Sequence, residues 1–196
     1  TTLRDGMVTS AVMNTVCAAG TGSFIEEQAR RLGCALDTYA EQVTGMRAPM
    51  ASDRCTVFMQ RDLSHLLSEG YSVQETLASV LHAVRENYLT KVAREADIGR
   101  RVCFQGATAK NRALVAAFEQ RLQQPILVSR YCHLTGALGV ALLLREQAAT
   151  ATAFKCLALA HANIHLRQEI CELCTNHFKL VLAEVQDEIA AYGFLC

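Results

Sequence analysis

The sequence lacks the features that mark membrane, exported and nucleic-acid-binding proteins. Nineteen basic residues balance nineteen acidic ones, so no net charge attracts a polyanion. The longest apolar runs, such as residues 136–144, are far shorter than the roughly 20 residues of a membrane span. The N-terminus also has no basic-then-apolar signal pattern. These absences predict a cytoplasmic protein that binds neither nucleic acid nor a membrane.

The composition is that of a globular protein with unusually many cysteines. Hydrophobic residues make up 51% of the 196 residues and charged residues 19%, enough for one sizeable core. Nine cysteines, an odd number without an export signal, indicate reduced thiols and not a disulfide framework. Some can hold a metal, whereas Cys34, Cys103 and Cys132 lie in or beside apolar stretches. We expect those three to be buried as small hydrophobic residues.

The hydrophobic pattern predicts an α/β fold over residues 1–147. Residues 1–12 read as a hairpin that turns at Asp5-Gly6, and we expect it to have further partner strands. Residues 101–147 alternate strand, helix, strand and helix, which indicates a parallel strand pair. Residues 55–59 are either a short strand or the extended approach to a helix. The expected helices cover residues 23–32, 37–43, 61–68, 73–96, 110–122 and about 135–147, and the strands of the pair cover 101–104 and 126–129.

The helix expected at residues 73–96 has the clearest pattern in the chain. Its apolar residues recur at spacings of three and four, which places them on one wide face. We therefore expect that face to be buried. Its members are Val73, Leu77, Val80, Leu81, Val84, Tyr88 and Val92.

Three glycine-bearing loops each precede a predicted helix. The sequence Ala-Ala-Gly-Thr-Gly at residues 18–22 directs free amide groups and the positive end of a helix dipole at whatever lies in the loop. It is neither a Walker A motif nor a dinucleotide-binding fingerprint. The second and third loops occupy residues 106–110 and 135–139. Each of the three, taken alone, favours a turn or a close helix packing contact over a ligand site.

Taken together, the loops resemble those of a known ATPase superfamily. Their order is similar to that in the second lobe of the actin, Hsp70 and sugar-kinase ATPases. More narrowly, four segments resemble the BadF/BadG/BcrA/BcrD ATPase family, which includes activators of 2-hydroxyacyl-CoA dehydratases and ATPase subunits of benzoyl-CoA reductase. The resemblance covers residues 3–146 and implies a ribonuclease H-like lobe with a mixed sheet flanked by helices. The four segments are residues 13–27, 55–62, 104–111 and 136–142.

The resemblance implies a cofactor set and the residues that hold it. In this family two cysteines per subunit bind half of a [4Fe-4S] cluster on the axis of a homodimer, and the matching positions here are Cys17 and Cys55. It also implies ATP or ADP with Mg²⁺ as the nucleotide. The implied nucleotide contacts are Gly20, Thr21 and Gly22 for phosphate and ribose, Gly106, Ala107 and Asn111 for adenosine, and Gly136 in the third loop.

The implied function is an ATP-dependent activator. A ferredoxin or flavodoxin reduces the cluster, and the electron passes at low potential to a 2-hydroxyacyl-CoA dehydratase or a benzoyl-CoA reductase. The alternative is a nucleotide-binding regulatory module of the same superfamily that has no cluster. A sugar or acetate kinase is a third possibility, but it leaves the cysteine motifs without a purpose.

Two departures from the family pattern bear on activity. The adenosine loop usually has two consecutive glycines, whereas the second position here is Ala107, where a methyl group fits only at negative φ. The superfamily's two phosphate loops, which position the metal and the attacking water, belong before Thr1. We therefore expect no ATP hydrolysis by this chain alone, and we assign no catalytic carboxylate.

Residues 148–196 form a second region, a linker followed by the start of a cysteine-containing segment. Cys171-x-x-Cys174 resembles an element that follows the ATPase modules of long activators, although Phe178 stands where that element has a third cysteine. His161 and His165 are four residues apart and would share the face of a helix, which gives a possible zinc site with the two cysteines. The alternative is that these four residues hold no metal.

Overall fold

The computed structural model divides the chain into two compact units, residues 1–143 and 144–196, which are described separately. The boundary expected between residues 147 and 148 stays a prediction. Within the described residues, no helix is both long and apolar enough to cross a membrane. The structure describes residues 1–13, 22–93, 98–147, 156–173, 175–185 and 188–193.

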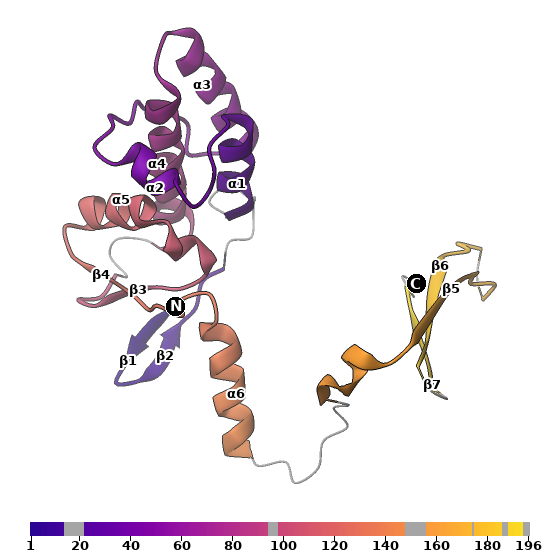
Figure 1. Ribbon diagram of the computed structural model, residues 1–196. Helices are drawn as coiled ribbons and strands as arrows, with labels where there is room; N and C mark the ends of the chain where they lie inside the picture. The colour runs from indigo at the N-terminus through magenta and orange to yellow at the C-terminus, as the bar shows by residue number, and fades with distance from the viewer. Residues whose placement is uncertain (14–21, 94–97, 148–155, 174, 186–187, 194–196) are drawn as a thin grey trace. The chain divides into compact units, whose positions relative to one another are not determined.

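The chain begins with the predicted hairpin (Figure 1). Strand β1 (Thr2–Arg4) pairs antiparallel with β2 (Met7–Ser10). Asp5 and Gly6 both have positive φ, 50° and 78°, as the tightest hairpin turns require. The hairpin leaves apolar side chains in solvent, and Val8 is 63% exposed. Its two strands bond only to each other within the described sheets, so further partner strands stay a prediction.

Five helices form the body of the first unit, and α4 packs against the other four. Helix α4 begins with a complete capping box, in which the Ser72 hydroxyl accepts from the Glu75 amide and the Glu75 carboxylate accepts from the Ser72 amide. The helix predicted at residues 61–68 already begins at Thr56, so residues 56–59 are helical and form neither the strand nor the extended approach that was expected. The five helices are α1 (Gly22–Arg31), α2 (Tyr39–Val43), α3 (Thr56–Ser68), α4 (Val73–Lys91) and α5 (Arg112–Leu122).

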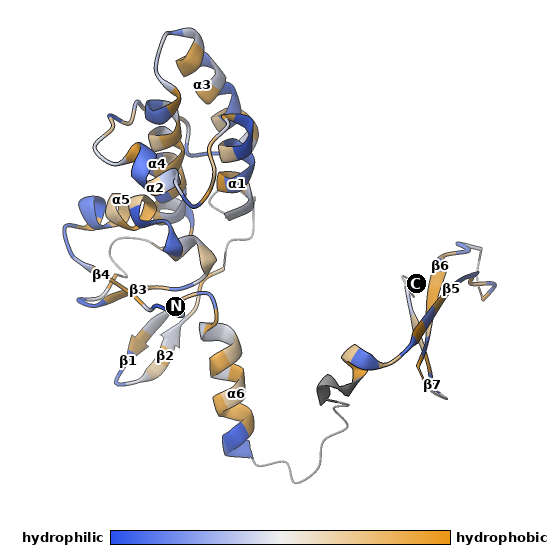
Figure 2. Cartoon of the chain, in the orientation of Figure 1, coloured by the Kyte–Doolittle hydropathy of each residue, from blue (hydrophilic) through white to orange (hydrophobic). Residues whose placement is uncertain are grey.

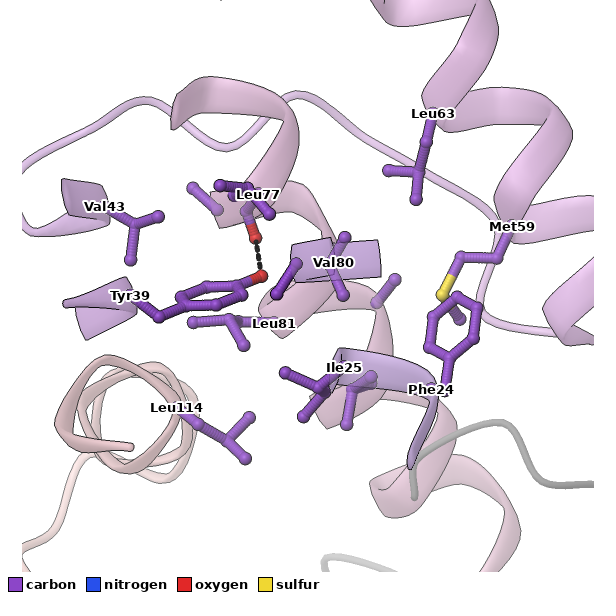
Figure 3. Packing of buried hydrophobic residues seen from close by; sticks show 14 of the residues in the cluster. Phe24, Ile25, Tyr39, Val43, Met59, Leu63, Leu77, Val80, Leu81 and Leu114 are labelled. Atoms are coloured by element: carbon purple, nitrogen blue, oxygen red, sulfur yellow. Dashed lines mark hydrogen bonds between the residues drawn. The ribbon is translucent and has the colours of Figure 1, made fainter. Parts of the chain in front are cut away.

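The core lies where these helices meet (Figure 3). Tyr39, Met59, Leu77 and Leu114 come from four different helices, and each is less than 3% exposed. The Tyr39 hydroxyl donates to the carbonyl of Leu77 at 2.9 Å, which satisfies a polar group that burial would otherwise leave unpaired. One core therefore connects α2, α3, α4 and α5.

The buried face of α4 differs from the predicted one near its end. Tyr88, expected to be buried, is 41% exposed, and the polar Asn87 is buried in its place. The Tyr88 ring meets Phe118 edge to face at a centroid distance of 5.8 Å. The earlier members of the predicted face, from Leu77 to Val84, are buried as expected.

The predicted parallel pair has one strand before α5 and one after it. Strand β3 (Val102–Phe104) pairs in parallel with β4 (Ile126–Val128), and a short 3-10 helix, η2 (Ala107–Lys110), leads into α5. Cys34 and Cys132 are buried, as expected. Cys103 is exposed, which corrects the prediction: it alternates with Val102 and Phe104, and the pleat directs it to the opposite face.

Helix α6 (Thr135–Gln147) is apolar along most of its length, as its orange colour in Figure 2 shows. Its apolar side chains are nevertheless exposed, and no residue of α6 is buried among the described residues. The exposed apolar residues are Leu138, Val140, Leu142, Leu143 and Leu144.

The second unit contains an antiparallel three-stranded sheet that the sequence pattern did not predict. Ion pairs from Arg167 to Glu169 and Glu184, at 2.9 and 3.1 Å, lie along β5 and between β5 and β6. The sheet order is β5-β6-β7. The elements of this unit are η3 (Cys156–His161), β5 (Ile164–Ile170), β6 (Lys179–Val185) and β7 (Glu188–Tyr192).

Candidate functional site

The described ends of the first and second glycine loops lie against each other. Gly22 is the first residue of α1, and a Cβ atom built on it would lie 2.8 Å from the Cγ2 of Thr108 in η2. That distance is shorter than real Cβ contacts, so only glycine fits here without a shift. Gly20 and Thr21, the other predicted contacts of the first loop, lie outside the described residues.

The second loop is in turn bonded to the segment that leads into the third. The amide of Gly106 donates to the carbonyl of Cys132 at 2.8 Å. The hydroxyl of Thr135, at the start of α6, donates to the same carbonyl at 3.1 Å. Gly136 is the next residue, and a Cβ atom there would meet no described atom within 4 Å. The structure thus brings the second and third loops together through Cys132.

The backbone of the second loop explains both its glycine and its alanine. Gly106 has φ 100° and ψ 165°, a conformation that is nearly restricted to glycine. Ala107 is not among the described residues with positive φ, so its methyl group causes no backbone strain. The alanine at the position of the family's second glycine is therefore compatible with the conformation of the loop.

Asn111 has a structural role that limits what else it can do. Its side-chain oxygen accepts from the amide of Leu114 at 3.1 Å and caps the N-terminus of α5. Its NH₂ group takes no part in this cap and is left for a contact with adenosine. Both functions are compatible, because the cap uses only the oxygen.

A basic groove of about 550 Å³ lies beside the second loop. Three cations line it, Lys110, Arg112 and Arg130, together with one acid, Glu119. Glu119 is occupied in part, because its carboxylate accepts from the Ile126 amide at 2.8 Å. A groove with this excess of positive charge favours an anionic ligand. Its remaining lining residues are Ala109, Val115, Val128, Ser129 and Cys132.

A second groove of about 550 Å³ lies between α2, α4 and α5 and includes His82. Burial, and next the neighbouring Arg85, lower the pKa of His82 below its ordinary value. The Nδ1 atom of His82 lies 3.2 Å from the Arg85 guanidinium, a contact that suits the neutral imidazole. None of the predicted nucleotide contacts that the structure describes lines this groove, so we assign the site to the glycine loops and not to His82.

Cys55, the predicted cluster ligand that the structure describes, is the N-cap of α3. It has an extended backbone, φ −145° and ψ 147°, and its thiol is half-buried and free of disulfide bonds. The thiol makes no capping bond, so it remains available as a ligand. Cys55 lies at the positive end of the dipole of this 13-residue helix. Cys17, its predicted partner, lies outside the described residues, and the separation of the two sulfurs stays a prediction.

The zinc site considered for the second unit does not form from its described members. His161 ends η3 and His165 lies in β5, so the two do not share the face of a helix, as the spacing had suggested. Cys171 is buried, and Cys174 lies outside the described residues. Where the structure describes the chain, no three His, Cys, Asp or Glu side chains group as metal ligands.

The sequence motifs missed three features of the site. Thr108 lies inside the segment 104–111 and contacts Gly22 through a methyl group, and Cys132 contributes its backbone carbonyl; neither residue was assigned a role from the sequence. Arg130 reaches the groove from the end of β4.

Comparisons with known proteins find relatives over most of this chain. The BadF/BadG/BcrA/BcrD ATPase family matches residues 1–144. The activator of lactoyl-CoA dehydratase from Anaerotignum propionicum is 36% identical over 146 residues, 73% of this chain and 55% of that protein. A component polypeptide of the benzoyl-CoA reductase from Thauera aromatica is 30% identical over 146 residues, 70% of this chain and 51% of that polypeptide.

A solved structure shows the same fold. Component A of the Acidaminococcus fermentans (R)-2-hydroxyglutaryl-CoA dehydratase matches with a TM-score of 0.68 and 29% identity, over 74% of this chain and 56% of that one. The chain spans about half the length of most of the curated relatives it matches. With its mixed α/β, actin-type ATPase fold, the chain belongs to the BadF/BadG/BcrA/BcrD ATPase family.

Proposed function

We propose that this chain is the nucleotide-binding lobe of an ATP-dependent activator that delivers an electron to an acyl-CoA dehydratase or reductase. The observation that carries the proposal is the meeting of the three glycine loops at Gly22, Thr108, Gly106 and Cys132. Relatives over the same residues are named as a dehydratase activator and as part of a benzoyl-CoA reductase. The partner enzyme we propose is therefore of one of these two classes.

The loops and the basic groove support binding of ATP or ADP with Mg²⁺. The amides at the start of α1 and the positive charges of Lys110, Arg112 and Arg130 favour phosphate. The conformation of Gly106 lets a nucleotide approach the backbone closely, because no Cβ atom stands in the way. Gly20, Thr21, Ala107, Asn111 and Gly136 complete the proposed contacts.

Cys55 fits the proposed [4Fe-4S] cluster. Its thiol is free, half-buried and located at a helix N-terminus. The neighbouring Val57 and Phe58 are 71% and 50% exposed, and such an apolar surface beside a ligand suits a face that a second copy covers. Cys17 and Cys55 from each of two copies would supply the four thiolates of the shell. The cluster would supply a low-potential one-electron store.

Nucleotide state controls the transfer in this proposal. A reduced ferredoxin or flavodoxin is the proposed electron donor. The glycine loops bind the triphosphate and the diphosphate with different affinity, and that difference shifts the population of the states that are competent for transfer. Cys55 is the N-cap of α3, and α3 packs on α4. Helix α1 also packs on α4, and its first residue, Gly22, borders the proposed nucleotide site. The proposed nucleotide site and the proposed cluster site are thus both connected to α4.

The test is anaerobic purification of the protein in its full natural length, followed by analysis of iron, sulfide and mass. We expect a brown dimer with about four iron atoms per two chains. Cys55→Ser should lose the iron, and Cys103→Ser should keep it because Cys103 is an exposed cysteine on β3. A colourless wild-type protein that still binds ATP would refute the electron transfer and favour the cluster-free regulatory module.

A further inference from the structure

Asn87 is a buried polar residue bonded to the backbone next to Cys55. It lies on the core face of α4 and is only 4% exposed. Its NH₂ group donates to the carbonyl of Asp53 and, at 3.5 Å, to that of Arg54. These carbonyls belong to the two residues immediately before Cys55. The side chain thus connects α4 to the start of α3.

A second buried polar residue of α4 bonds to the same loop at its other end. The hydroxyl of Ser79 donates to the carbonyl of Pro49 at 2.6 Å. Eight residues of helix separate Ser79 from Asn87, about 12 Å along the axis. Four residues of loop separate Pro49 from Asp53, about 13 Å when extended. Since the two lengths agree, the loop can run nearly extended along α4 with both ends held.

The bonds of Asn87 act on the peptide units that fix the orientation of Cys55. The Arg54 carbonyl belongs to the peptide unit that contains the amide of Cys55, and the Asp53 carbonyl belongs to the unit before it. A fixed peptide plane restricts the backbone of Cys55 at its extended φ and ψ, and with it the direction of the thiol. Burying an amide is costly unless it is hydrogen-bonded, so these two bonds also account for a polar side chain in the core.

We propose that Asn87 is a positioning residue that holds the Cys55 thiolate in the geometry the cluster requires. The inference rests on the proposed function, because it needs Cys55 to be a ligand. Ser79 holds the same loop at Pro49, six residues before Cys55, and the bond it makes there does not involve Asp53 or Arg54. The two residues therefore separate positioning of the ligand from general support of the loop.

The test compares Asn87→Asp with Ser79→Ala in the full-length protein, loaded with its cluster and kept anaerobic. Asn87→Asp keeps the shape of the side chain but removes the NH₂ donors, whereas Ser79→Ala removes the other bond between α4 and the loop. We expect iron release to a chelator to be about 10- to 100-fold faster in Asn87→Asp, the usual effect of losing an outer-shell partner. The EPR spectrum of the reduced cluster should change in the same variant. Ser79→Ala should resemble the wild type in both measurements.

Asn87→Leu covers the case in which a buried carboxylate prevents folding, because leucine is similar in size and uncharged. It should release iron as fast as Asn87→Asp. Equal release rates for wild type, Ser79→Ala and both Asn87 variants would overturn the inference and leave the proposed function intact. Failure of both Asn87 variants to fold would assign the residue to the core alone and overturn it too. A wild-type protein without iron would instead refute the proposed function.

Discussion

The contact between Gly22 and Thr108 predicts that Gly22→Ala destabilises the protein when residue 108 is threonine and stabilises it when residue 108 is serine. In Gly22→Ala the new methyl carbon would lie 2.8 Å from the Cγ2 of Thr108, so one of the loops must shift. Overpacking of this kind costs about 1–3 kcal/mol. Alanine at a helical position gains about 0.5–1 kcal/mol over glycine. We therefore expect a net loss of about 1 kcal/mol in the free energy of unfolding.

Thr108→Ser removes the opposing methyl group and should reverse the sign of the effect of Gly22→Ala on the free energy of unfolding. In that background Gly22→Ala loses its clash and keeps its helical gain, so it should stabilise the protein by about 0.5 kcal/mol. The difference is a coupling energy of about 1–2 kcal/mol, within the range for residues in contact. Urea unfolding of the four proteins measures it, provided that the m-values agree.

The matched control is Gly136→Ala, since no described atom lies within 4 Å of a Cβ atom at that position. It should be neutral or slightly stabilising in either background. If Gly22→Ala cost the same with Thr108 and with serine, the two loops would not be in contact. The site as we describe it would then be wrong, whatever the protein does.

Two further predictions concern α5 and α4. Asn111→Ala should lower the free energy of unfolding by about 1 kcal/mol because the cap on the Leu114 amide is lost. Asn111→Ser should keep the stability of the wild type, because serine is also a good N-cap. A nucleotide titration of both variants separates the loss of the cap from the loss of a ligand contact. Burial and Arg85 lower the pKa of His82, an effect that Glu86 partly opposes, so stability should fall as the pH drops from the ordinary pKa of 6.5 through the lower pKa of the folded state. Urea unfolding at several pH values across this range gives the free energy of unfolding as a function of pH, and His82→Gln should make that dependence weaker. An equally steep dependence in the variant would show that His82 is not its cause.

Local signals in the sequence predicted most of the first unit. Asp5-Gly6 predicted the hairpin because few residue pairs adopt two positive φ angles. Gly33, at φ 70°, marks the end of α1 for the same reason. The regular spacing of Leu77, Val80 and Val84 predicted α4 and its buried face.

The features that were missed depend on tertiary contacts. Asn87 is buried because a distant loop supplies two carbonyls, and a polar residue gives no sign of such partners in the sequence. The run Lys179–Val185 is largely apolar, and short runs of this kind do not distinguish a strand from a helix. His161 and His165 suggested a helical pair only because their spacing was read without the change from η3 to β5 that falls between them.

The candidate site shows the same division. The glycine loops were visible as motifs, but their meeting was implied only by resemblance to a family. The contact of Gly22 with Thr108 and the bond from Gly106 to Cys132 join segments that no local pattern connects. One of these contacts is a backbone hydrogen bond, which any residue can accept.

The distance along the chain between the joined loops has a consequence for folding. Gly22 contacts a residue more than 80 positions later in the sequence, so forming this contact must close a long loop of chain. A nucleotide that binds here would recognise the folded state and not the unfolded chain. Its presence at 100 times its dissociation constant would then add about 2.7 kcal/mol to the stability of the whole unit, so that a thermal shift would report ligand binding.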